Sequence, residues 1–145
     1  NMNSSNTNSG GWTSCAMRST HLPAILALMP TEVQNGIREV NKLTSAGSQS
    51  ATINTTADKL FLLSEIEIFG SVSYSKSGEG TQYDYYKAGN SKVHYRHDST
   101  GSAVTAWTRS AYSGNGSNFC LVNTDGTPNN NNADNSRALA PGFAA

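Results

Sequence analysis

The last forty residues constrain this chain most, because they alternate short apolar anchors with long polar loops. The anchors are Trp107, Phe119–Val122, Leu139 and Phe143, and Asn, Ser, Gly, Thr and Asp fill the intervals between them. Such loops tolerate left-handed backbone and offer hydrogen-bond donors and acceptors, but they supply few groups that can drive chemistry. A rigid frame that carries a polar loop surface is typical of binding modules. The pattern therefore favours recognition over catalysis.

Composition narrows the class further. Only 14% of the residues are charged, the formal net charge is +0, and the Lys and Arg residues are scattered. Nucleic-acid binding normally needs a basic patch, so a nucleic-acid partner is not expected. No apolar stretch approaches the ~20 residues of a membrane span. The chain opens on Asn1, and we expect an upstream region that attaches the domain to a larger assembly or lets it form a homo-oligomer.

The chain reads as one domain over residues 10–145, preceded by a loose polar lead-in over residues 1–9. Pro23 in a first turn predicts a helix that ends before Pro30. A capping box at Thr31 and Gln34 predicts a second helix with Ile37 and Val40 toward the core.

Later segments favour extended structure. The 42–56 region, rich in Ser and Thr, predicts a flexible stretch with at most a short strand at 52–54. The apolar run 58–63 predicts a strand, and a second capping box at Ser64 and Glu67 predicts a helical turn before Gly70. Residues 71–91 predict a long loop, and 92–96, 104–109, 118–123 and 137–143 predict short strands, with a turn at 124–126. Helices first and short antiparallel strands later indicate an α+β fold.

Six short motifs stand in one order from Gly10 to Phe143. They are G-G-W-x-x-C-x-M-R (10–18), D-K-L-F-L-L-S-E-I-E-I-F-G (58–70), G-E-G-T-Q-Y-x-Y-Y (78–86), W-x-R-S (107–110), F-C-x-V-x-x-D-G (119–126) and A-P-G-F (140–143). Together they resemble the DUF6273 family of bacterial and phage proteins, which is related to the C-type-lectin-like fold. The resemblance implies two short N-terminal helices packed on a small twisted antiparallel sheet with long loops. Ala106 departs from it, since the family usually has two aromatic residues before x-R-S, and the 137–143 ending only approximates the family's.

C-type-lectin-like folds also carry the variable proteins of diversity-generating retroelements, in which adenines of template Asn codons are randomised. After Trp107 the chain lacks Lys, Gln, Glu, Met and Trp, which an Asn codon cannot reach through adenine changes. The residues that it can reach dominate there. Polar loops lack Lys and Glu for other reasons too, so a fixed binding loop stays an alternative. The resemblance implies a phage or surface-displayed protein, in the virion or at the bacterial cell surface, whose C-terminal loops bind a protein or glycan ligand on a cell.

The predicted ligand-binding surface follows from the polar positions of these loops. Trp107, Phe119 and Phe143 are expected to lie beneath it. The loop 129–132 is expected to face the ligand, since each amide both donates and accepts; a solvated linker is the alternative. The members of the predicted ligand-binding surface are Ala106, Thr108, Tyr112, Asn115, Asn118, Asn129, Asn130, Asn131, Asn132, Asp134 and Asn135, with His94, Arg96 and Asp98 as additional candidates.

Catalysis and metal binding find less support. Calcium needs several carboxylates, and in the C-terminal loops only Asp125 and Asp134 supply negative charge. His94 and His97 lack a nearby Cys for zinc. Cys15 and Cys120 allow one disulfide or two buried thiols, and the second is favoured. No metal, cofactor or catalytic residue is therefore expected. A structural module of a phage or cell-surface assembly, or an enzyme resembling the formylglycine-generating group, is the alternative.

Two further features each allow two interpretations. Arg109 beside Trp107 could form an anion or cation–π site, but a structural role that ties loops together is favoured. Tyr83, Tyr85 and Tyr86 with Glu79 either line a pocket or cover the helices.

Overall fold

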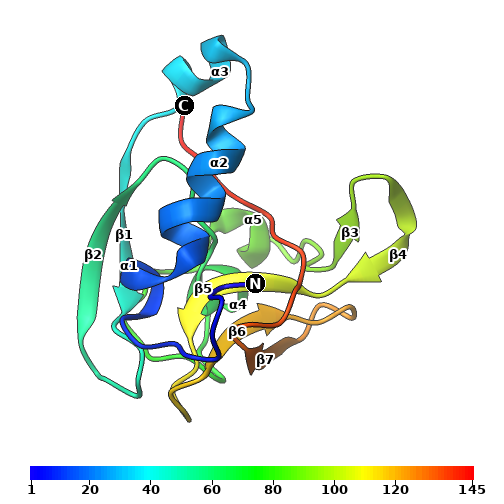
Figure 1. Ribbon diagram of the computed structural model, residues 1–145. Helices are drawn as coiled ribbons and strands as arrows, with labels where there is room; N and C mark the ends of the chain where they lie inside the picture. Colours follow the sequence, from blue (N-terminus) through cyan, green and yellow to red (C-terminus); the bar gives the residue numbers. More distant parts are fainter.

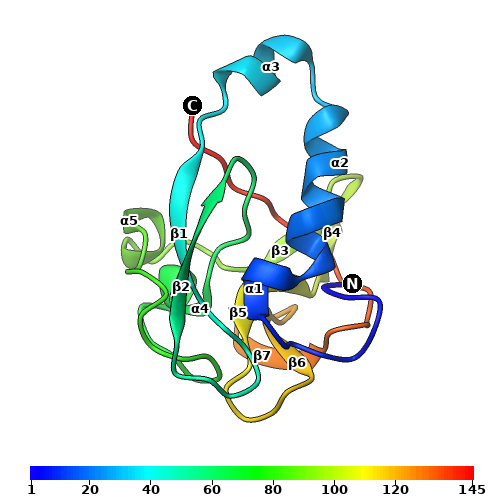
Figure 2. The same cartoon turned by 60° about the vertical axis from the view of Figure 1, so that its left-hand side comes forward.

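The computed structural model describes the backbone of residues 1–145 and all side chains except those of Ser99 and Thr100. Short helices combine with small antiparallel sheets and long connections, and the fold is α+β as the sequence predicts (Figure 1). The three sheets in the described part of the chain have the strand orders β1-β2, β3-β4 and β5-β6-β7. In Figure 2, α3 lies at the top of the molecule, in the connection that leads from α2 to β1.

Helical turns form the N-terminal layer and bury Trp12, Met17 and Leu22 in the core. They are α1 (Gly11–Ser14), a π-helical turn (Met17–His21), α2 (Leu22–Ala27) and α3 (Thr31–Gly36). Pro23 lies in the first turn of α2, as predicted. The expected capping box at Thr31 is wrong, because Pro30 is the N-cap of α3 and no side chain caps it. The second helix also ends earlier than predicted: Ile37 is buried but extended, and Val40 begins a strand.

The region expected to be flexible is instead an antiparallel hairpin. β1 (Val40–Ser45) pairs with β2 (Ile53–Asp58) in continuous register from Val40↔Asp58 to Ser45↔Ile53. Its inward side chains are polar, among them Lys42, Thr44 and Thr56. A strand whose buried face is polar shows no alternation of apolar and polar residues, so the sequence pattern did not predict this hairpin.

The capping box at Ser64 is confirmed. α4 (Glu65–Phe69) begins with the Ser64 side chain accepting from the Glu67 N–H while the Glu67 carboxylate accepts from the Ser64 N–H. Gly70 ends the helix at φ 75°, in the left-handed region that favours glycine. The expected 71–91 loop contains one short helix, α5 (Asp84–Lys87).

Three of the later strands lie close to their predicted places: β3 (His94–Arg96), β5 (Ala106–Ala111) and β6 (Asn118–Val122). Two others, β4 (Ser99–Val104) and β7 (Pro128–Asn132), were not predicted. The β3–β4 hairpin projects from the body of the molecule (Figure 1). The expected strands at 58–63 and 137–143 are not regular strands; apart from the end of β2 at Asp58 they pair through isolated bridges, Phe61↔Gly142 and Ala106↔Ala138.

Residues 1–9 differ from the expected loose lead-in. Met2 and Asn8 are fully buried, and the Met2 N–H donates to the Ala133 carbonyl at 2.8 Å. Gly47 allows this packing, since at φ +70° a Cβ there would lie 1.7 Å from the Asn8 carbonyl oxygen. The N-terminal segment is therefore part of the packed domain.

Candidate ligand-binding surface

β5 passes through the interior, so its residues are not available to a ligand. All six are buried, including Ala106 and Thr108, and the Thr108 hydroxyl donates to the Cys120 carbonyl at 3.0 Å. The prediction that Ala106 and Thr108 belong to the binding surface is therefore wrong. The strand lies between β6 and the segment that contains Leu63, whose carbonyl accepts from the Arg109 N–H.

The 112–118 loop is held rigidly from beneath. The buried Asn8 amide donates to the carbonyls of Tyr112, Asn115 and Asn118 at 2.7–3.3 Å. The Asn115 side chain oxygen accepts from the N–H groups of Ser117 and Asn118, so it shapes the turn. Tyr112 is half-buried and meets the Tyr74 ring edge-to-face, with centroids 5.9 Å apart. The loop thus presents a fixed conformation.

The four consecutive asparagines form a strand, β7, and not the predicted loop. β7 is an edge of its sheet, and three of its side chains form hydrogen bonds with asparagine side chains outside the strand. Asn118 donates to the Asn130 side chain at 2.7 Å, and Asn135 donates to the Asn131 side chain at 2.7 Å. Asn129 donates to Asn123 at 3.3 Å.

Two of the predicted residues at the end of β7 point outward. Asn132 and Asp134 are exposed. Asn118 pairs with Asn132 across β6 and β7 and donates to the Asn130 side chain, and the Tyr112 N–H donates to the Asn118 carbonyl. We call Tyr112, Asn118, Asn130, Asn132 and Asp134 the polar surface.

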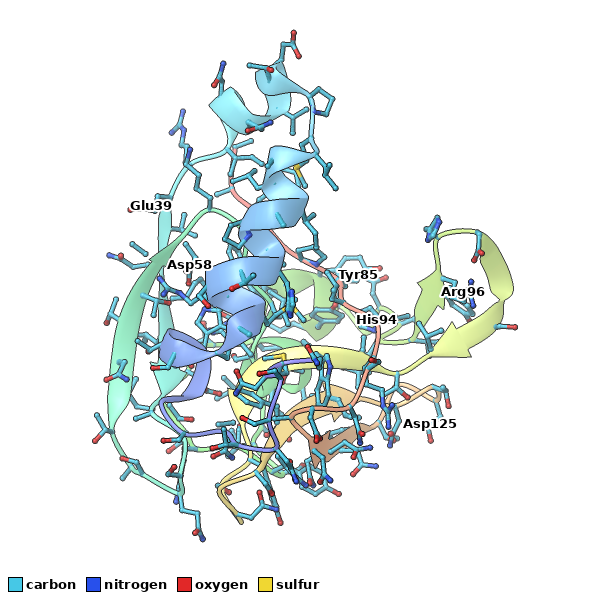
Figure 3. All side chains as sticks on the ribbon, viewed as in Figure 1. Glu39, Asp58, Tyr85, His94, Arg96 and Asp125 are labelled. Carbon is cyan, nitrogen blue, oxygen red and sulfur yellow. The ribbon has the colours of Figure 1, made fainter. Side chains whose placement is uncertain are left out.

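The additional candidates His94, Arg96 and Asp98 do not form one site. Arg96 and Asp98 form an exposed ion pair, with both Arg96–Asp98 hydrogen bonds at 3.1 Å. Figure 3 shows Arg96 on the projecting hairpin. His94 is half-buried and lines a cavity of about 40 Å³ with Trp107. Burial lowers the pKa of His94 despite a hydrogen bond to the Lys92 backbone. Among the expected anchors, Trp107 and Phe119 are buried, whereas Phe143 is exposed and does not lie beneath the polar surface.

A buried network of charged side chains holds the sheet layers together, and sequence reasoning recognised only Arg109 in it. The Arg109 guanidinium bonds both carboxylate oxygens of Glu67 and the carbonyls of Leu43, Leu62 and Glu79. Lys42 adds a 2.6 Å ion pair to Glu67. The structural role favoured for Arg109 is thereby confirmed.

The pKa values of the two carboxyl groups in this network, Glu67 and Glu79, are shifted in opposite directions. Burial disfavours the charge of Glu67, but the hydrogen bonds and charge of Arg109 outweigh it, so the pKa of Glu67 lies below its ordinary value. Burial raises the pKa of Glu79, although Ser110, Ser45 and Thr44 donate to its carboxylate. The motifs S-E-I-E, G-E-G and W-x-R-S contain Glu67, Glu79 and Arg109. They are the sequence signal from which the network could have been predicted.

The tyrosine cluster lines a pocket, one of the two readings that the sequence left open. Tyr83, Tyr85 and Tyr86 are among its walls, but Glu79 is buried elsewhere in the network. Figure 3 shows Tyr85 beside the C-terminal segment, which supplies another wall.

Neither cysteine thiol is exposed. Cys15 and Cys120 are free and buried; burial raises the pKa of Cys15 to about 11 and that of Cys120 well above its ordinary value. No group of three or more His, Cys, Asp or Glu side chains is placed to hold a metal ion among the described residues. No helix of that part is both long and apolar enough to cross a membrane.

Comparison with known proteins gives one match. No curated protein and no solved structure is similar enough to be matched. A family model described as Domain of unknown function (DUF6273) matches residues 1–144, nearly the whole chain. The chain therefore belongs to the DUF6273 family.

Proposed function

We infer that this chain is a non-catalytic binding domain of C-type-lectin-like fold, displayed on a virion or a bacterial cell surface, whose polar surface binds a protein or glycan ligand. The observation that carries the proposal is the anchoring of that surface. Asn8 fixes the 112–118 loop, and the Asn118–Asn130 bond fixes the strand beside it. Polar groups that are ordered before binding lose less conformational entropy when a ligand binds.

We also infer that the polar surface is diversified, as in the variable proteins of diversity-generating retroelements. Exposed side chains such as Asn132 and Asp134 can change without disturbing the core, whereas Trp107, Phe119 and Arg109 are buried beneath. The residue types after Trp107 support this proposal, because they are those that Asn codons reach through adenine changes.

Sequencing the gene deeply in a natural population of its carrier tests the proposal. We expect substitutions at adenine positions only, confined to codons 94–139 and concentrated at Tyr112, Asn132 and Asp134. Codons 1–93 of the same gene are the internal control. Ala106 and Thr108 provide a stricter one, since both lie within the window but are buried. A uniform gene, or substitutions as frequent at these buried positions as at Asn132, would contradict a diversified contact surface.

A further inference from the structure

A pocket of about 480 Å³ lies on elements that contribute nothing to the polar surface. Its volume is within the range of about 300–1,000 Å³ that small-molecule sites occupy. Three of its aromatic side chains reach solvent together, with exposed fractions of 38% for Tyr83, 61% for Tyr85 and 51% for Phe143. Grouped exposed aromatic rings are uncommon unless they bind something.

The rings of the pocket are held in place from behind. Lys42 donates from Nζ to the Tyr83 hydroxyl at 3.0 Å and lies 4.3 Å from the centroid of the Phe61 ring. Lys42 also forms a 2.6 Å ion pair with Glu67, a carboxylate that it shares with Arg109. Tyr85 and Tyr86 contact each other edge-to-face, with centroids 5.1 Å apart. The walls are therefore ordered before any ligand arrives, which favours binding.

Asp84 is the one charged residue among those that line the pocket. The Lys42 ammonium lies behind this lining, 4.3 Å from the centroid of the Phe61 ring and 5.4 Å from that of the Tyr83 ring. The Asp84 ion pair with Lys87 is exposed, at 3.3 Å, and such pairs contribute little. The faces of the Tyr and Phe rings add negative potential. A cation is the complementary ligand for ring faces beside one carboxylate.

We propose that this pocket binds an organic cation, an alkylammonium group seated against Tyr83, Tyr85 and Phe143 with Asp84 at its rim. The ammonium belongs to a quaternary headgroup of the choline type or to a lysine side chain of a protein. This goes beyond the proposed function, because it uses separate residues. Its failure would leave the substitution pattern expected at the polar surface untouched.

The test is a titration of the full chain, followed by amide and tyrosine NMR shifts, with choline and with its uncharged isostere 3,3-dimethylbutan-1-ol. We expect choline to bind about tenfold more tightly than the isostere, since a desolvated cation–π contact contributes about 1–2 kcal/mol. N-acetyl-lysine methylamide is the third probe; tighter binding than choline assigns the site to a lysine side chain, and weaker binding assigns it to a quaternary headgroup.

Variants locate the site. Tyr85→Ala and Asp84→Asn each change an exposed side chain, so the fold is retained, and each should weaken choline binding about fivefold or more. Tyr95→Ala is the matched control, because Tyr95 is also exposed, at 50%, but lies on β3, outside the pocket lining. Equal binding of choline and the isostere, no binding of any cation, or unchanged affinity in the two pocket variants would overturn the proposal.

Discussion

At the scale of single residues, Arg109 shows how one side chain organises a fold with few regular elements. Its planar guanidinium presents five N–H donors in fixed directions, which a Lys ammonium cannot do. It uses them to join β1 through Leu43, the extended segment through Leu62, and the 71–91 loop through Glu79. Glu67 is the carboxylate that balances this buried charge. The family motifs around these residues are thus explained by the packing of the domain.

Glu67→Gln should lower the free energy of unfolding at neutral pH by about 3–5 kcal/mol, because it leaves two buried cations without their carboxylate. The pKa of Glu67 is lowered in the folded state, so its stabilisation is present above the ordinary value of 4.5 and lost as pH falls through the folded pKa. Urea unfolding across the acid range measures this. The difference between wild type and variant should shrink toward low pH.

Glu79→Gln is the matched comparison, with the opposite sign. The folded pKa of Glu79 is raised, so its contribution is present below 4.5 and lost as pH rises through the folded pKa. Gln removes this dependence and should cost much less than Glu67→Gln at neutral pH. Equal losses for the two variants at every pH would show that the network does not separate them in this way.

At the scale of elements, β7 explains the asparagine run. Hydrogen bonds at both ends of the β6–β7 pair, Ala133 N–H to Ser117 and Asn123 N–H to Thr127, place the N–H groups of Asn130 and Asn132 on the outer edge. The Asn129 side chain accepts from the Asn130 N–H at 2.8 Å, and the Asn131 side chain accepts from the Asn132 N–H at 2.8 Å. Pro128 has no N–H. The edge therefore offers no free donor to another strand, a protection that edge strands need.

The double variant Asn129→Ala, Asn131→Ala uncovers these two donors. We expect self-association that grows with concentration, measured by sedimentation velocity, and a loss of about 0.5–1.5 kcal/mol in stability for each hydrogen bond. Asn132→Ala is the control, since its exposed side chain does not cap the edge. If the double variant sediments like wild type at every concentration, the capping has no protective role.

The elements that the sequence predicted well are those whose signals are local. The capping box at Ser64 and the turn before β7 depend on neighbours in the chain, and both are present. β1 and β7 were missed, and β2 was predicted only as a short strand at 52–54, because the inward or edge positions of these strands carry Lys, Thr and Asn, whose roles depend on distant partners. Two of the eleven main candidate residues failed for the same reason: burial of Ala106 and Thr108 depends on segments that pack on both sides of β5.

At the scale of the whole molecule, both chain ends are tied into the fold. The Arg38 N–H donates to the Ala144 carbonyl at 2.8 Å, and the N-terminal segment packs between β1–β2 and the 112–118 loop. Asn8 joins these parts, because its amide holds the loop while its oxygen accepts from the Ser48 N–H. Composition alone could not reveal this, since Asn8 and Asn6 stand in the same polar stretch.

Asn8→Ala separates the two asparagines experimentally. Removing a buried side chain that satisfies several backbone groups should lower stability by about 1–3 kcal/mol and speed amide hydrogen exchange in the 112–118 loop and at Ser48. Asn6→Ala should change neither, because Asn6 is exposed. Thermal unfolding and hydrogen exchange distinguish the two variants. If Asn8→Ala leaves loop exchange at the wild-type rate, the rigidity of the polar surface does not come from the N-terminal segment, and the proposed recognition surface loses its physical basis.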